Sequence, residues 1–410
     1  MSRSPRVLVV SRLFPPEVSA GAFRLGALAR SLVRHRSDVR VLTTTPPEHA
    51  PRADDDRGVD VRRWPVLRDR GGNVRGYIQY ASYDAPMLFR MLFTRFDLVV
   101  AESPPTTGLV AIVVAWLKRR PVVYYAADVW TDGVISMGAP KVVVAIMRFM
   151  ETTVLRRAAA VISVSAEVTE RLVLLRADPS KITTVGNGID TDVFSPDAAK
   201  ASEERYFVYT GTMSEWQQPE IFVRAFALIA ADEPDLRLRF FGQGSVESEL
   251  RRLAEELVPG KVEFGGVVRP SESASWIRGA VASLVSIVPG IGYDFAKPTK
   301  TYAAAAVGTP VLFAGPEAGS ALVEGAELGH SVQFTPDSAA AGMRSLLAEA
   351  ADGTSERLRS VRVRWARANV SLDAVADRVT VAIAQVLPEQ AAKLEFASEH
   401  TPDGDERPTS

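Results

Sequence analysis

A segment near residue 300 places two lysines beside the start of a predicted helix. Lys297 and Lys300 flank Pro298-Thr299, and a run of small residues follows before a glycine–proline stop signal. The first N–H groups of a helix have no partner inside the helix, so together with ammonium groups they hold anions. We expect a diphosphate site here, held by Lys300, Lys297 and these N–H groups. Solvated lysines on a loop are the alternative.

Another charged loop follows the first apolar run of the chain. It joins a predicted strand, Arg6–Val10, to a predicted helix over residues 21–33. Gly21 allows close backbone approach where this helix starts, and Arg24 adds positive charge to its first turn. Such a helix start holds a phosphate or a sugar oxygen. A capped surface turn is the alternative.

Carboxylates follow a later apolar run of the first half. Asp128 and Asp132 come after residues 122–125 and lie beside Trp130. Side chains of this kind orient sugar hydroxyls, or they cap the helix that follows. Both roles agree with a position at the end of a strand.

Glycine-containing loops follow two apolar runs of the second half. Gly211 and Gln217 come after residues 206–209, and Gly242 and Gly244 come after the next run. Because ligands of α/β sheets bind outside the carboxyl ends of the strands, we expect ligand contact at these loops. Ordinary turns are the alternative, since a lone Gly-x-Gly lacks the third glycine of a dinucleotide fingerprint.

The elements that position these loops alternate between strand and helix in two series, with a boundary in residues 190–204. Apolar runs predict strands at 6–10, 39–43, 98–101, 122–125, 160–164, 206–209, 236–241, 262–264, 282–287 and 311–313. Helical periods are predicted at 21–33, 107–117, 142–155, 219–230, 245–257, 301–307, 339–348 and 361–386. The pattern predicts an α/β fold with two doubly wound parallel sheets in tandem and a cleft between them. The polar tail 389–410 is expected to be disordered.

The composition of the chain excludes several kinds of site and partner. The chain has 410 residues, no cysteine and a net charge of −1, which excludes disulfides, thiolate metal sites and a global basic field for nucleic acid. The Asp54–Asp56 run is expected to be a solvated turn rather than a metal site. No apolar run is long enough for a signal peptide or a membrane span, so a cytoplasmic protein is expected. Residues 86–96 mix aromatic side chains with arginine; they are expected to form a helix packed on the core, with membrane contact as the alternative.

Taken in order, the motifs resemble glycosyltransferase family 4, whose members are retaining nucleotide-sugar enzymes with the GT-B fold. The resemblance covers residues 6–385 and is closest to a bacterial surface-polysaccharide subgroup related to fucosamine and N-acetylglucosaminyl transferases. The matching segments are Phe14-Pro-Pro-Glu17 with Gly21 and Arg24, Asp128-Val-Trp130, Val185-Gly-Asn-Gly-Ile-Asp190, Gly242-x-Gly244, Pro298-Thr-Lys300, Ala306-Val-Gly-Thr-Pro-Val311 and Gly315-Pro-Glu317-Ala318.

The resemblance implies two tandem Rossmann-like domains and a division of roles between them. Residues 1–192, joined by the helical region 365–388, would form the acceptor domain, and residues 193–364 the donor domain. The implied reaction moves a sugar from a nucleotide-diphosphate sugar to a hydroxyl of a glycan, a lipid-linked or a small-molecule acceptor, without a metal or cofactor. Catalytic roles fall on Lys300, Arg24 and Asp128. The implied donor-binding residues are Gly21, Gly211, Gln217, Gly244, Asp294, Lys297, Pro298, Thr299 and Glu317.

The chain departs from the family at the donor site. Two family glutamates are replaced by Phe295 and Ala303, so Asp294 or Glu317 would have to take over the contact to the ribose. Thr212 and Gln217 stand where the family has arginine and lysine. A catalytically silent subunit that binds nucleotide sugars or acts as a scaffold is therefore an alternative. A nucleotide-sugar epimerase is disfavoured because no histidine lies in a candidate loop.

Overall fold

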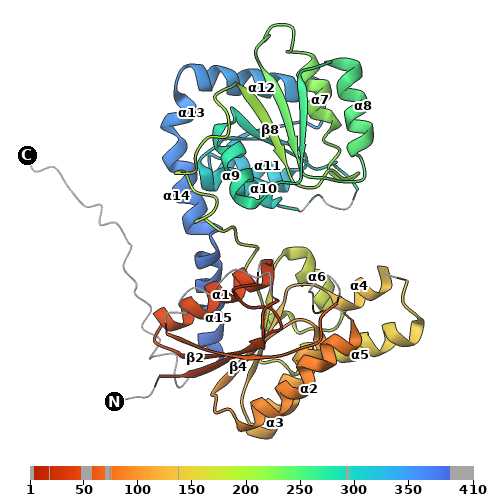
Figure 1. Ribbon diagram of the computed structural model, residues 1–410, viewed down its shortest axis with the longest axis vertical. Helices are drawn as coiled ribbons and strands as arrows, with labels where there is room; N and C mark the ends of the chain where they lie inside the picture. Colours follow the sequence, from red (N-terminus) through yellow and green to blue (C-terminus); the bar gives the residue numbers. More distant parts are fainter. Residues whose placement is uncertain are drawn as a thin grey trace, which may run out of the picture. The chain divides into compact units, whose positions relative to one another are not determined.

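The structure is a computed structural model that describes residues 4–17, 19–47, 58–69, 74, 76–136, 138–291, 294 and 296–387. The chain divides into two compact units (Figure 1). The first combines the chain up to Val185 with the chain from Ala376 on, and the second spans Gly186–Val375. The predicted tail, the Asp54–Asp56 turn and Phe295 lie outside the described residues.

The first unit contains a seven-stranded parallel sheet in the order β3-β2-β1-β4-β5-β6-β7. Its central strands are short apolar runs with nearly every residue buried, as expected when helices cover both faces of a parallel sheet. The strands are β1 (Arg6–Val10), β2 (Asp38–Thr44), β3 (Val59–Trp64), β4 (Leu98–Glu102), β5 (Val122–Ala126), β6 (Ala160–Ser163) and β7 (Ile182–Thr184).

Helices of the first unit connect these strands. At the start of α1 the Ser19 side chain caps the helix by accepting from the N–H of Ala22. They are α1 (Ala20–Arg34), α2 (Tyr77–Phe93), α3 (Pro105–Lys118), α4 (Trp130–Ser136), α5 (Lys141–Arg157) and α6 (Ala166–Leu174). The chain returns to this unit in α15 (Leu372–Val386), where Asp377 accepts from Ser31 Oγ at 2.6 Å and from Arg34 at 2.9 Å.

The second unit contains a six-stranded parallel sheet in the order β10-β9-β8-β11-β12-β13. Its apolar side chains form one cluster under α7, α8 and α12 and another under α9, α10, α11 and α14, so helices cover both faces (Figure 1). The strands are β8 (Tyr206–Thr210), β9 (Arg237–Phe241), β10 (Val262–Gly266), β11 (Ala282–Ser286), β12 (Val311–Ala314) and β13 (Gly329–Val332). The helices are α7 (Glu220–Ala227), α8 (Glu247–Leu257), α9 (Pro270–Gly279), α10 (Thr299–Val307), α11 (Glu317–Gly325), α12 (Pro336–Ala351), α13 (Thr354–Arg357) and α14 (Arg359–Asn369).

The predicted architecture, two doubly wound parallel sheets in succession, is confirmed. The unit boundaries differ from the expected 192/193 and 364/365, because the segment after Val185 pairs with the end of α14. Ile189 N–H donates to Val370 O, and Leu372 N–H donates to Ile189 O. These two bonds join the segments to each other, and Ile189 and Val370 pack in the apolar cluster around α10, so residues 186–192 and 365–375 group with the second unit.

The strand order reverses once in each sheet. β1 lies between β2 and β4, and β8 lies between β9 and β11. In sheets of this class the loops beside such a reversal form the binding position at the carboxyl edge. In the part of the chain that the structure describes, no helix combines the length and the hydropathy needed to cross a bilayer.

Candidate functional site

Lys300 lies in the first turn of α10, beside the loop that leaves β8. Its Nζ donates to Thr212 O (3.1 Å) and to Gln217 Oε1 (3.2 Å), and it lies 3.7 Å from the centroid of the Tyr209 ring. Burial lowers the pKa of Lys300 well below the ordinary lysine value, and no carboxylate among the described residues offsets that effect. The ammonium group is therefore held by neutral oxygens and a π face, which leaves its charge available to an anion.

Gln217 completes this arrangement from the side of the β8 loop. Its side chain is buried, and Oε1 is also 2.9 Å from the Tyr209 hydroxyl, which lies 2.7 Å from Thr212 O. The family resemblance assigned a lysine to this position, and the structure shows a neutral amide that positions Lys300 instead. A neutral amide, rather than a second cation, thus lies beside the partly buried Lys300.

Two glycine loops pack backbone against backbone at the same edge. A Cβ at Gly244 would lie 1.8 Å from Met213 O, and a Cβ at Gly242 would lie 2.0 Å from Gly211 O. Gly211 itself has a φ of +105°, and a Cβ there would approach Lys300 Cε to 3.1 Å. The glycines are required because any side chain would separate the two loops and displace Lys300.

The other predicted donor-binding residues lie around α10 and α11 with different exposures. Lys297, Thr299 and Glu317 are exposed, and Pro298 is buried. Asp294 Oδ1 accepts from Gly290 N–H at 2.8 Å, so this carboxylate closes a turn. α10 begins without a side-chain cap, which leaves its first N–H groups for a ligand or water.

Two hydroxyls near this edge, those of Ser286 and Thr301, were not predicted from the sequence, and the structure also shows the surroundings of Ala303. Ser286 Oγ ends β11 and Thr301 Oγ1 lies in the first turn of α10; both are buried without a hydrogen-bond partner among the described residues. Ala303 packs in the apolar cluster around α10, so this position offers no polar contact to a ribose. Serine and threonine beside a strand end were the available signal, and they are too common to single out.

The predicted loop of the first unit is built around a residue that the sequence analysis did not name, Glu102. This carboxylate ends β4 and is buried; Oε2 accepts from Ser11 Oγ at 2.5 Å and Oε1 from Arg24 at 3.1 Å. A Cβ at Gly21 would lie 3.0 Å from Glu102 Oε1, which explains the glycine. Arg24 is therefore neutralised by an ion pair instead of standing free for an anion.

The carboxylates after β5 take different roles. Asp128 is exposed, whereas Asp132 pairs with Arg171 at 2.7 Å. The start of α4 is capped by Glu151, which accepts from the backbone N–H groups of Trp130 and Thr131 and whose pKa is raised by burial. Asp128 therefore does not cap this helix. Both aspartates line a largely apolar depression of 480 Å³ together with Trp130, Val134 and Val168.

The described residues contain no group of three or more histidine, aspartate or glutamate side chains placed to hold a metal ion. The polar groups described at the two sheet edges are cations, carboxylates, helix N–H groups and hydroxyls. In the second unit these groups suit a phosphorylated ligand. In the first unit Arg24 and Asp132 are engaged in ion pairs, whereas Asp128 is exposed.

Two domain families match the chain in the same order as its two units. Residues 20–188 match the glycosyl transferase 4-like domain, and residues 204–349 match the glycosyl transferases group 1. Each match contains one of the two parallel sheets, apart from β1 at the start of the first.

Curated relatives match over part of the chain. D-inositol 3-phosphate glycosyltransferase 2 of Catenulispora acidiphila is 30% identical over 166 residues, 36% of this chain and 38% of that protein. D-inositol 3-phosphate glycosyltransferase of Streptomyces scabiei is 29% identical over 184 residues, 40% of each chain. The match thus spans about two fifths of these relatives' length. Their names differ from the fucosamine and N-acetylglucosaminyl subgroup that the motifs suggested.

Solved structures share the fold along nearly the whole chain. A glycosyltransferase from Rickettsia africae has a TM-score of 0.64 at 12% identity, covering 94% of this chain and 99% of that one. Anabaena HepE in complex with UDP and glucose has a TM-score of 0.57 at 13% identity, covering 93% and 99%. These neighbours place the two units in the GT-B fold.

Proposed function

We propose that this chain, which belongs to the glycosyltransferases built from a 4-like domain and a group 1 domain, moves a sugar from a nucleotide-diphosphate sugar to a hydroxyl acceptor. The observation that carries the proposal is Lys300 at the uncapped start of α10, held by Thr212 O and Gln217 and by no carboxylate among the described residues. Partial burial takes this ammonium group away from water, and a bound anion would stabilise its charged form in place of water. HepE, a structural neighbour, is described in complex with UDP and glucose, which supports a nucleotide-sugar donor.

In the proposed reaction the departing diphosphate accumulates negative charge as the glycosidic carbon loses its leaving group. Lys300 and the first N–H groups of α10 stabilise this charge, and such preorganised electrostatic stabilisation is a large catalytic contribution. The donor-binding roles proposed for Gly211, Gly244, Lys297, Pro298 and Thr299 follow from their positions around the same edge. We propose retention at the anomeric carbon, with a phosphate oxygen of the leaving group taking the acceptor proton, and a metal-independent mechanism.

The first unit is proposed to bind the acceptor. Asp128 is exposed beside the apolar depression after β5 and orients acceptor hydroxyls in this account. Arg24 donates to Glu102, and Gly21 leaves room for that carboxylate. Both residues therefore fix the conformation of the loop after β1 and act on the acceptor only indirectly. The relatives named D-inositol 3-phosphate glycosyltransferase support a polyol acceptor, and a role in polysaccharide or glycoconjugate biosynthesis is proposed from the motifs.

A catalytically silent nucleotide-sugar subunit is the second candidate, and Ala303 is the observation that favours it. This position lies in an apolar cluster and offers no carboxylate to a ribose. The transferase and the silent subunit would both bind the nucleotide sugar, and only the transferase would turn it over.

Thermal unfolding of the full chain with UDP-, GDP-, TDP- and ADP-linked sugars tests donor binding, because a ligand of the folded state raises the apparent stability. We expect one nucleotide to raise the melting temperature selectively. That donor is then incubated alone, with D-inositol 3-phosphate and with a lipid-linked sugar acceptor while release of the nucleoside diphosphate is measured. Acceptor-dependent release supports transfer. A shift without release under any of these conditions contradicts transfer and supports the silent subunit; no shift with any donor contradicts the donor site.

A further inference from the structure

Two neighbouring helices of the first unit present apolar side chains to solvent. In α3, Val113, Trp116 and Leu117 follow helical spacing and are exposed, Trp116 to 68%. In α5, Val142, Ile146 and Phe149 also follow helical spacing and are exposed, and the exposed fraction of Phe149 is 69%. The opposite faces of both helices are buried in the core. Helices that are apolar on both faces are ordinarily covered on both, so the outward face of α3 and α5 is expected to have an occupant.

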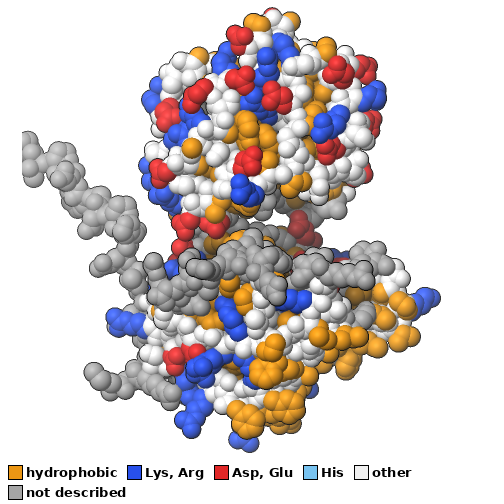
Figure 2. All heavy atoms as spheres, in the orientation of Figure 1, with side chains coloured by type: hydrophobic (Ala, Val, Ile, Leu, Met, Phe, Trp, Pro, Cys, Tyr) orange, Lys and Arg blue, Asp and Glu red, His pale blue; other side chains and the backbone are white. Residues whose placement is uncertain are grey.

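The charges on this face have a single sign. α3 contains no acidic residue, and the one acidic residue of α5, Glu151, is buried and bonded to the start of α4. Arg119, Arg148 and Arg157 are exposed at the ends and flank of the two helices and form no ion pair within the described residues. Figure 2 shows hydrophobic side chains gathered on this part of the first unit, with Lys and Arg at the margin.

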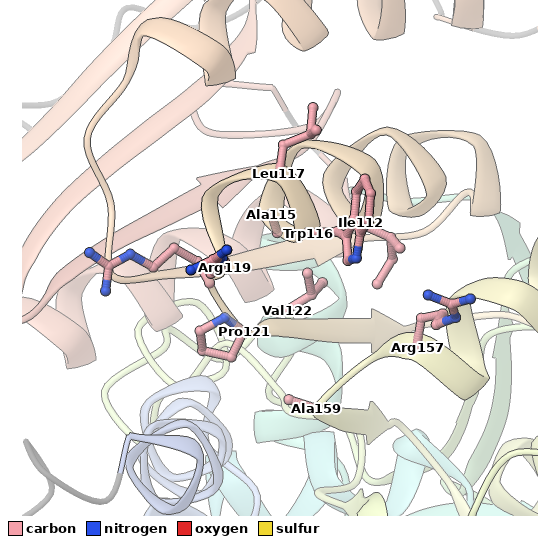
Figure 3. A pocket seen from close by; sticks show the side chains of 10 residues that line it. Ile112, Ala115, Trp116, Leu117, Arg119, Pro121, Val122, Arg157 and Ala159 are labelled. Atoms are coloured by element: carbon pink, nitrogen blue, oxygen red, sulfur yellow. The ribbon is translucent and has the colours of Figure 1, made fainter.

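A hollow joins the ends of the two helices. It has a volume of 540 Å³ and is lined by Trp116, Arg119 and Arg157 over an apolar floor that includes Ile112 and Val122. Figure 3 shows Arg119 and Arg157 on opposite sides of this hollow. A further lining residue, Arg120, is 3.7 Å from Asp97 and is partly neutralised. Guanidinium groups above an apolar floor match a phosphate group attached to hydrocarbon.

We infer that the α3–α5 face, defined by the exposed apolar residues of the two helices and the arginines around them, binds the surface of a bilayer that contains anionic lipids. The apolar side chains enter the region between headgroups and acyl chains, and Arg119 and Arg157 take lipid phosphates at its edge. A second copy of the chain would bring two cationic faces together, which disfavours a symmetric dimer here. The inference is independent of the proposed donor site, because none of these residues belongs to the second unit.

Co-sedimentation of the full chain with phospholipid vesicles tests the inference. We expect binding to vesicles of phosphatidylcholine with phosphatidylglycerol and much weaker binding to phosphatidylcholine alone. Arg119→Gln with Arg157→Gln should weaken binding to the mixed vesicles by roughly tenfold or more, since each basic residue near an anionic surface contributes on the order of 1 kcal/mol. Trp116→Ser with Phe149→Ser should also weaken it, because less apolar surface enters the interface.

Matched controls come from the second unit. Val267→Ser with Ile291→Ser removes two exposed apolar side chains, and Arg364→Gln with Arg367→Gln removes two exposed cations. Both controls should bind vesicles as the unmodified chain does, and thermal denaturation establishes that every variant is folded. Failure of the unmodified chain to bind anionic vesicles overturns the inference. Binding of the α3–α5 variants that equals binding of the unmodified chain also overturns it. So does a chain that binds no vesicles and forms a dimer which Trp116→Ser with Phe149→Ser dissociates.

Discussion

At the scale of single residues, Lys300 combines a stability cost with the proposed donor contact. Its ammonium group is partly buried against Thr212 O, Gln217 and the Tyr209 ring, and this loss of solvent lowers its pKa well below the ordinary value of 10.5. The unfolded chain therefore binds more protons than the folded chain between the lowered pKa and about 10.5. Between these two pKa values the free energy of unfolding of the unmodified chain rises with pH. Below the lowered pKa, the full destabilising effect of the desolvated charge is present.

Lys300→Met removes the charge at nearly constant length. The Tyr209 hydroxyl can still donate to Thr212 O, and Ser214 Oγ lies 3.4 Å from Gln217 Oε1 as its donor, so neither acceptor is stranded. We expect the variant to be at least as stable as the unmodified chain at pH 7, with an advantage that shrinks as the pH rises towards 10.5. Thermal melts of both proteins across this range measure it. A variant that is less stable at every pH would show that the lysine is a net stabilising residue, contrary to this account.

At the scale of elements, the donor site depends on close contact between the loops after β8 and β9. Gly244→Ala would place a Cβ 1.8 Å from Met213 O, so the backbone must move. We expect a loss of about 3 kcal/mol in the free energy of unfolding, together with weaker donor binding, measured by denaturant titration and by calorimetry.

Gly325→Ala is the matched control for this substitution. Gly325 ends α11 in the same unit, and a Cβ there meets no atom within 4 Å. Since alanine favours helix, this variant should be neutral or more stable by up to about 1 kcal/mol. Equal effects of the two substitutions would contradict the packing argument.

Local sequence signals were sufficient for the central elements. Continuous apolar runs predicted β1, β4 and β5, and the stop signals at the end of α10 predicted its boundary, where Gly308 has a φ of +81°. β3 was missed because it lies at the sheet edge and alternates charged with apolar residues. The helices α9 and α11 were missed because their runs are short and mix serine, glycine and glutamate.

The side-chain partners at the two edges could not be predicted in the same way. Arg24 meets Glu102, a residue 78 positions away that matches no motif, and Lys300 meets Gln217 across 83 positions. Pairs of this kind arise when the sheet order brings two strand ends together, and no local spacing encodes them. The sequence therefore indicated which loops matter, whereas only the fold shows which charges are neutralised.

At the scale of the whole molecule, each unit has its own apolar core and its own edge of polar loops. The first unit buries a cluster under α2, α3 and α5, and the second buries two clusters on the faces of its sheet. Each unit also carries cations that form no ion pair with the described part of the chain, among them Arg119, Arg148 and Arg157 in the first and Lys300 in the second. Lipid phosphate is the proposed partner of the three arginines, and the donor diphosphate is the proposed partner of Lys300.

Calorimetric titration of the selected nucleotide sugar into three proteins tests the donor assignment most directly. The unmodified chain is compared with Lys300→Met and with Lys261→Met, whose lysine also donates to two backbone oxygens, Ala230 O at 2.6 Å and Glu233 O at 3.3 Å. Lys261 precedes β10 and so lies at the opposite, amino edge of the same sheet. We predict that Lys261→Met binds as the unmodified chain does and that Lys300→Met binds at least roughly tenfold more weakly, the loss of one charge-assisted hydrogen bond. Unchanged affinity in Lys300→Met, with the fold intact, would contradict the account.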